Sequence, residues 1–99
     1  MKAHQAKKII EVDEFCLHNH VEMSFIRLLQ QNGLLEFIMI EESLFIGADQ
    51  LRQLEKMVRF YYELNINMEG IESITHLLNQ INDLQNEMKT LKNKLQFYE

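Results

Sequence analysis

Apolar side chains recur at helical spacing in two stretches of the first two thirds of the chain. Between Glu22 and Asn32 they fall on one helical face, and Gly33 follows where a left-handed residue would end the helix. After Gly47 a second set recurs at the same spacing as far as Leu64. The pattern therefore predicts two amphipathic helices, one in each stretch.

A shorter helix is predicted upstream of these two. Asp13 is a good N-cap residue, so we expect a short helix that begins at Glu14. The pair Asn19-His20 is expected to form a tight turn between this helix and the next. The residues before the helix, 9–12, are mostly β-branched and are typical of a strand.

Two runs of β-forming residues, 37–40 and 44–46, are joined by the three residues Glu41-Glu42-Ser43 and predict a hairpin over residues 37–46. Because side chains alternate along a strand, Phe37 and Met39 share one face of the first run, and Ile38 and Ile40 share the other. Both faces are apolar, and one of them can cover the helical core. The other face needs a cover, which either the upstream β-branched run or a binding partner could supply.

From Ile71 onward the spacing of apolar residues becomes a strict heptad. The a and d positions are Ile74, Leu77, Ile81, Leu84, Met88, Leu91, Leu95 and Tyr98. An isolated helix of this length is marginal in water, so its apolar seam must be buried against another surface. We therefore expect a coiled-coil homodimer, and the charges beside the seam do not settle its orientation. The dimer seam is expected to consist of Ile81, Leu84, Met88, Leu91 and Leu95.

Together these elements predict a mainly α protein with a winged helix–turn–helix head, a small β-hairpin wing and a long C-terminal coiled-coil helix. The expected head covers residues 1–70, and the C-terminal helix covers residues 71–99. Shortly before this boundary, Asn65 is expected to end the third helix with left-handed backbone, and Asn67 is expected to cap the helix that follows.

The composition excludes several classes of protein. The chain has 99 residues, one cysteine and no proline. This length is typical of one domain, and a single cysteine excludes an intrachain disulfide. No apolar run is long enough to cross a membrane or to act as a secretion signal. We therefore expect a protein of the bacterial cytoplasm that does not associate with membranes.

Acidic residues dominate the middle of the chain. The whole sequence has a net charge of −5, and residues 13–70 contain four basic residues against ten acidic ones, a net charge of −6. Proteins gain most of their affinity for nucleic acids by neutralising phosphates with Lys and Arg, so this charge weighs against DNA binding. A basic protein partner, in contrast, would be attracted to the same region.

No group of residues predicts an enzyme or a cofactor site. The sequence lacks a glycine-rich phosphate loop, a nucleophile elbow and a zinc-protease motif. Cys16, His18 and His20 are two residues apart, and residues at that spacing point to opposite sides of a helix. They cannot bind one metal ion unless the segment is extended. We therefore expect a non-catalytic protein with neither cofactor nor metal, in which Cys16 is a small core residue.

Several of these segments resemble MerR-like regulators. Residues 21–35, with Arg27 and the closing Asn-Gly-Leu-Leu, resemble the helix–turn–helix of those proteins. Residues 64–71 resemble the entry to the helix that precedes their dimerisation coil. Residues 14–18 are similar to the opening of the chaperone modulator family (CbpM-like), a family of small MerR-like proteins. The likeness to this family covers residues 9–99, almost the whole chain.

The resemblance implies a MerR-like winged helix–turn–helix that acts on a protein partner. In the chaperone modulator family the partner is the J-domain of a DnaJ-type co-chaperone, CbpA, and binding inhibits its co-chaperone action. MerR-like relatives dimerise through antiparallel C-terminal helices, which implies the same orientation here. We expect partner-binding residues on the wing and at the third helix. They are Glu36, Phe37, Met39, Glu41, Glu42, Asp49 and Glu55.

Two other functions stay open on the sequence alone. MerR-like relatives include DNA-binding transcriptional regulators, but Leu28-Leu29 stand here in place of their Tyr-Tyr pair. His20 replaces their turn glycine, and the wing carries Glu41 and Glu42 where basic side chains would bind phosphates. The third function is that of a structural coiled-coil adaptor with no regulated partner.

Overall fold

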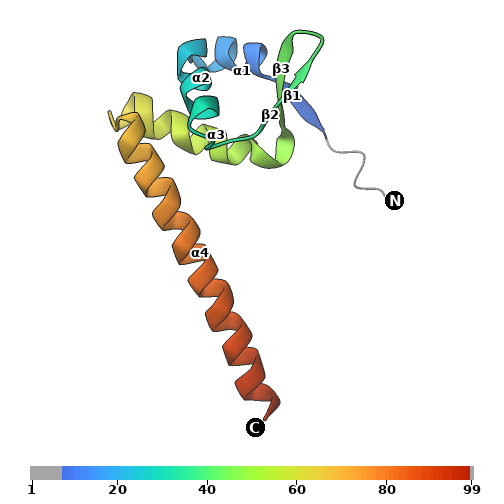
Figure 1. The fold of residues 1–99 in the computed structure, drawn as a ribbon, viewed down its shortest axis with the longest axis vertical. Helices are drawn as coiled ribbons and strands as arrows, with labels where there is room; N and C mark the ends of the chain where they lie inside the picture. The colour runs from blue at the N-terminus through green and yellow to red at the C-terminus, as the bar shows by residue number, and fades with distance from the viewer. Residues whose placement is uncertain (1–7, 99) are drawn as a thin grey trace.

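Four α-helices and a three-stranded sheet are present in the computed structural model, which describes residues 8–98 (Figure 1). The elements are β1 (Ile9–Glu11), α1 (Val12–Asn19), α2 (Met23–Gln31), β2 (Phe37–Ile40), β3 (Ser43–Gly47), the 3₁₀ turn η2 (Ala48–Gln50), α3 (Leu51–Val58), the π-helical turn η3 (Arg59–Glu63) and α4 (Met68–Phe97). The sheet and α1 to α3 form a head, and α4 extends away from it (Figure 1). This arrangement is compatible with the predicted winged helix–turn–helix.

One small apolar core holds the head together. Its fully buried side chains are Val12, Phe25, Ile26, Leu29, Ile46, Leu54, Met57 and Ile71. They come from all four helices and from the central strand, so each element of the head contributes to the same core. Removal of these side chains from water is the main force that fixes the positions of the helices.

Three helix ends form as the sequence predicts. Gly33 and Asn65 adopt left-handed backbone, with φ values of 67° and 55°. The Asn67 side chain accepts a hydrogen bond of 2.8 Å from the backbone N–H of Gly70, so Asn67 is the N-cap of α4. These predictions are confirmed because each depends on the conformational preference of a single residue and its near neighbours.

The predicted start of α1 is wrong. The helix begins at Val12 rather than Glu14, with Glu11 at the N-cap position and Asp13 inside the first turn. Val12 is fully buried in the core. Packing of this side chain stabilises a helix that begins two residues earlier than predicted. In its actual place Asp13 still interacts favourably with the positive end of the helix dipole.

The third predicted helix is not uniform, because η2 precedes α3 and the π-helical turn η3 follows it. In η3 the Tyr61 ring stacks on Phe25 with centroids 4.5 Å apart, and Tyr62 meets the same ring edge-on at 5.7 Å. The Tyr62 hydroxyl also accepts a hydrogen bond of 3.0 Å from the backbone N–H of Glu22, at the start of α2. These contacts with α2 are tertiary, so helical periodicity alone does not predict the π-helical turn.

The strands form one antiparallel sheet in the order β1-β3-β2. On the inner face, Ile46 lies between Ile10 and Phe37 and faces the core. The β1 strand does not cover the second face of the hairpin. It adds to the free edge of β3, because edge pairing satisfies its backbone N–H and C=O groups. Ile38 and Ile40 therefore remain exposed on the outer face.

The hairpin turn has an unusual composition. It contains two residues instead of the predicted three, because Ser43 already pairs with Ile40 as the first residue of β3. Both turn residues have left-handed backbone, Glu41 with φ 48° and Glu42 with φ 69°. Turns of this kind favour Asn and Gly, since left-handed backbone costs most other residues roughly 1–2 kcal/mol each.

Only the beginning of α4 belongs to the core. Ile71 and Thr75 are buried, and every described residue from position 76 onward is exposed. The predicted division between residues 70 and 71 lies within the first turn of this helix, which is continuous from Met68 to Phe97. The head therefore fixes where α4 starts, while most of the helix projects beyond it (Figure 1).

Residues better suited to the hairpin turn should stabilise the head. For Glu41→Asn with Glu42→Gly we expect the free energy of unfolding to rise by about 1 kcal/mol, because Asn and Gly adopt left-handed backbone at lower cost. Urea denaturation at constant protein concentration should show a higher midpoint with an unchanged slope. An equal or lower midpoint would mean that this turn is not strained.

Candidate functional site

The structure separates the predicted partner-binding residues into three places. Glu41 and Glu42 are exposed at the tip of the wing. Met39 lies near them on the inner side of the sheet and is 64% exposed. Phe37, in contrast, is partly buried and packs against the core. The wing tip thus offers two carboxylates and one thioether to a partner, whereas Phe37 has a structural role.

The second place is the base of the wing. The backbone N–H of Glu36 donates a hydrogen bond of 3.1 Å to Oε1 of Gln50, which joins the start of the wing to η2. Asp49 is in the same turn, and a Cβ atom at Gly47 would lie only 2.6 Å from its Oδ1 atom. A side chain at position 47 would therefore require the Asp49 carboxylate to shift.

The third place is on the far side of α3, where Glu55 lies apart from the other acidic residues of the predicted set. It lines a shallow recess together with Phe15 and Asn19 of α1 and with Arg59 and Glu63 of η3. The six other predicted residues belong to the wing or to η2. Glu55 therefore does not belong to the same surface as the wing.

A recess between the wing and the helices joins Met39 and Glu42 of the predicted set to residues of α1 and α2 that sequence reasoning did not group with them. Asp13, Met23, Arg27, Gln30, Met39, Glu42 and Leu44 line it. Arg27 is the only basic residue of α2, and it shares the recess with the carboxylates of Asp13 and Glu42. In a winged helix–turn–helix that binds DNA, the second helix and the wing approach the phosphates. Here the carboxylates of Asp13 and Glu42 lie in the same recess as Arg27.

The outer face of the sheet is a further surface that sequence reasoning did not select. Ile9, Ile38 and Ile40 are each 41–42% exposed on it, and Phe45 is partly exposed between them. The alternation of side chains in β2 did indicate two apolar faces. It could not tell which face the helices would cover, since that depends on the position of the sheet in the fold.

The segment with one cysteine and two histidines does not form a cluster. Cys16 is buried. Burial is the larger cause, and the negative charge of Asp13 the smaller, that raises the pKa of its thiol, so the thiol stays protonated at neutral pH. His18 is exposed, with Nδ1 2.9 Å from the backbone oxygen of Glu14, and His20 adopts left-handed backbone after α1. Within residues 8–98 no three His, Cys, Asp or Glu residues are grouped as a metal site would require.

The heptad residues of α4 form a continuous exposed apolar stripe. Its members Ile81, Leu84, Met88, Leu91 and Leu95 are each between 49% and 68% exposed. The head covers the first turns of α4, and its Gln53 and Lys56 share a recess with Ile81, the first residue of the stripe, which is still 49% exposed. Such a row of large apolar side chains on one helix face is the type of surface that is buried by association.

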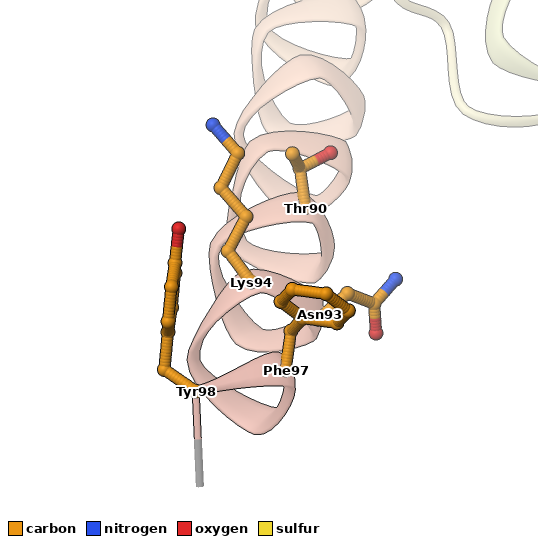
Figure 2. A pocket seen from close by; sticks show the side chains of 5 residues that line it. All are labelled: Thr90, Asn93, Lys94, Phe97 and Tyr98. Carbon is orange, nitrogen blue, oxygen red and sulfur yellow. The ribbon is translucent and has the colours of Figure 1, made fainter.

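The end of α4 has an aromatic pair. In Figure 2 the Tyr98 side chain extends along the helix toward Lys94, and the Phe97 ring lies between Lys94 and Asn93. The two rings meet edge-on with centroids 5.6 Å apart. The recess drawn there is lined by residues of α4 alone, so it is a surface depression of one helix. It has no second wall that could enclose a ligand.

Comparison with known protein families gives a match over most of the chain. Residues 10–93 match the model of a family described as MerR HTH family regulatory protein. The match includes the whole helix–turn–helix, the wing, and α4 as far as Asn93. No curated protein and no solved structure matches the chain significantly. Among the described residues no helix is both long and apolar enough to cross a membrane.

The charges around Arg27 lead to a prediction about nucleic acid. We expect random duplex DNA at physiological salt to bind more weakly than about 10⁻⁴ M, because the carboxylates near α2 repel phosphates. Fluorescence anisotropy of a labelled duplex, titrated with the full chain, measures this affinity. A micromolar dissociation constant at that salt concentration would contradict the electrostatic argument.

Proposed function

The chain belongs to the MerR HTH family of regulatory proteins, and from this premise we propose that it is a non-catalytic regulator that binds and inhibits a J-domain co-chaperone of the DnaJ/CbpA type in the bacterial cytoplasm. The chain's resemblance to the chaperone modulator family suggests this partner. The observation that carries the proposal is the acidic surface of its winged helix–turn–helix.

The acidic surface changes what this scaffold can bind. The wing tip presents Glu41 and Glu42, and the recess beside α2 contains Asp13 together with Arg27. Residues 13–70 have a net charge of −6, so the field around the head attracts cations and repels phosphates. A basic protein surface is therefore a better partner for this head than a nucleic acid.

The proposed mechanism is competition for the basic helical face of the J-domain. Acidic residues of the head would attract that face and increase the rate of encounter. Once the complex has formed, the bound head would cover the surface of the J-domain that the Hsp70 chaperone needs. Inhibition of this kind needs no chemical step, so it agrees with the absence of an enzyme motif from the sequence.

A homodimer is part of the proposal. Two copies of the apolar stripe from Ile81 to Leu95 would bury each other, and the heptad spacing keeps the stripe on one side of the helix. The projection of α4 away from the head supports this, since the stripe is accessible to a second copy along its length (Figure 1). A dimer would carry two heads and could bind two J-domains.

The alternative function is that of a MerR-like transcriptional regulator that binds DNA. The presence of α1, α2 and a two-stranded wing in the expected order favours it. A regulator of this kind needs basic residues where the helix meets the phosphates, and α2 has only Arg27. The DNA titration described above bears on this alternative, because a DNA-binding regulator should reach micromolar non-specific affinity for random duplex at physiological salt.

Charge reversal at the wing tip tests the proposed function. The variant Glu41→Lys with Glu42→Lys should bind the J-domain more weakly, chiefly through an association rate that falls by about tenfold or more at low salt. Stopped-flow mixing with the J-domain measures the rate. The matched control Glu55→Lys with Glu63→Lys changes the net charge equally on the far side of α3 and should have a smaller effect. Equal rates for the wing variant and the wild type would contradict docking at the wing.

The inhibitory activity requires its own measurement. Addition of the wild-type protein should reduce the stimulation of Hsp70 ATPase by the J-domain co-chaperone, and the wing variant should reduce it less at the same concentration. No effect of the wild-type protein on the stimulated ATPase rate would refute the proposed function, whatever the binding data show.

The dimer is tested at its seam. The variant Leu84→Asp with Leu91→Asp should be monomeric, because an unpaired carboxylate buried in an apolar seam costs several kcal/mol or must take up a proton. Light scattering at tens of micromolar should report a dimer for the wild type and a monomer for this variant. The control Asn79→Asp with Asn86→Asp adds the same charges outside the seam and should remain dimeric. A monomeric wild type would rule out the proposed homodimer.

A further inference from the structure

The outer sheet face is an apolar surface that no described element covers. It consists of Ile9, Ile38, Ile40 and Phe45. The opposite face of the sheet packs against the helical core through Ile46. In Figure 1 the helices α1 and α2 lie to one side of the sheet. The head thus has one layer of helices and one uncovered sheet face.

We propose that the outer sheet face, with the adjoining wing tip, is the docking surface for an amphipathic helix that carries lysine or arginine beside an apolar stripe. This inference rests on the proposed function, because it assigns the basic helix of the J-domain to a particular surface of the head. The sequence predicts that Phe37 contacts the partner, but it packs against the core. The apolar contact with the partner is therefore assigned to the opposite face of β2.

Charge complementarity supports a basic occupant. Glu11 lies on the outer face as the cross-strand neighbour of Phe45. Glu41 and Glu42 follow directly after Ile40 at the wing tip. Lys8 precedes β1 at the opposite end of the sheet, since β1 pairs there with the last residue of β3. The face therefore has the carboxylate of Glu11 on it and that of Glu41 at its tip, where a positively charged end of a helix would be attracted, while Glu42 also lines the recess that contains Arg27.

The dimensions of the face fit a single helix. Three antiparallel strands lie roughly 4.8 Å apart, so the face is about 10 Å wide, which is close to the diameter of a helix with its side chains. Gly47 in the middle strand, beside Ile9, adds no side chain to the face, and the Asp49 carboxylate lies close to its backbone. The strand side chains on either side form a shallow apolar bed for such a helix.

The area of the face argues against a second copy as its occupant. Three half-exposed isoleucines and part of one phenylalanine expose apolar surface on the order of a few hundred Å². A stable dimer buries about 800 Å² on each partner. The face alone is too small for such an interface, whereas one helix that is also held by charges needs less apolar area.

The composition of the hairpin turn is a further argument. Glu41 and Glu42 hold left-handed backbone that Asn and Gly would adopt at lower cost. Strained positions that keep unfavourable residues are concentrated at functional sites. The two carboxylates adjoin the outer sheet face, so a role in docking accounts for their presence in a turn that they destabilise.

Substitution of the outer sheet face tests the proposal. We would measure binding of the purified J-domain of the organism's own DnaJ-type co-chaperone to the full chain by calorimetry. The variant Ile38→Thr with Ile40→Thr retains β-branched side chains, and hence strand propensity, while removing apolar surface. It should bind at least about tenfold more weakly than the wild type. The control Leu17→Gln with Leu64→Gln removes two exposed leucines elsewhere on the head and should bind like the wild type.

A second measurement covers the case in which the threonine variant fails to fold. In spectra of the ¹⁵N-labelled wild type, the J-domain should shift the amide resonances of β2, β3 and the wing tip, and leave those of α4 beyond Leu78 unshifted. Shifts confined to α3 or α4 would overturn the proposal.

The remaining outcomes separate this inference from the proposed function. If the J-domain binds the wild type and the threonine variant equally, the docking surface is wrong and the proposed function stands. If it binds neither, the proposed function fails, and this inference fails with it. If light scattering gives the threonine variant a lower molecular mass than the wild type, a second copy occupies the face and the proposal is overturned.

Discussion

Burial of Ile46 at the centre of the sheet is the constraint on which the rest of the head depends. This side chain is fully buried, and its strand lies between β1 and β2. With Ile46 turned toward the helices, alternation along the strand turns Phe45 outward, and the cross-strand neighbours must follow. The same core contains Ile71, so it also determines where α4 leaves the head.

A head of this size cannot bury all of its apolar surface. One layer of helices covers one face of the sheet, and the first turns of α4 fill the remaining part of the core. Two apolar surfaces are left, the outer sheet face and the stripe along α4. They lie on separate elements that extend in different directions from the core, so one can serve a second copy while the other serves a different partner (Figure 1).

Acidic residues dominate the charge around the winged helix–turn–helix, which disfavours contact with phosphates. The geometry of α1, α2 and the wing would permit contact with a DNA duplex, but geometry alone does not supply affinity for phosphates. Arg27 shares its recess with Asp13 and Glu42, and the wing tip adds Glu41. Under the proposed function, this charge, and not the geometry of the scaffold, would direct the head toward a basic protein surface.

The sequence by itself determined the features that depend on near neighbours. The left-handed ends at Gly33 and Asn65 and the cap at Asn67 follow from single-residue preferences, and the two apolar faces of β2 follow from alternation. Only the tertiary structure decided where α1 begins, which face of β2 is covered and how η3 forms. Those features depend on contacts between distant residues, such as Glu22 with Tyr62, forty positions apart. Local preferences are weaker than the burial of a shared core, so packing decides wherever the two compete.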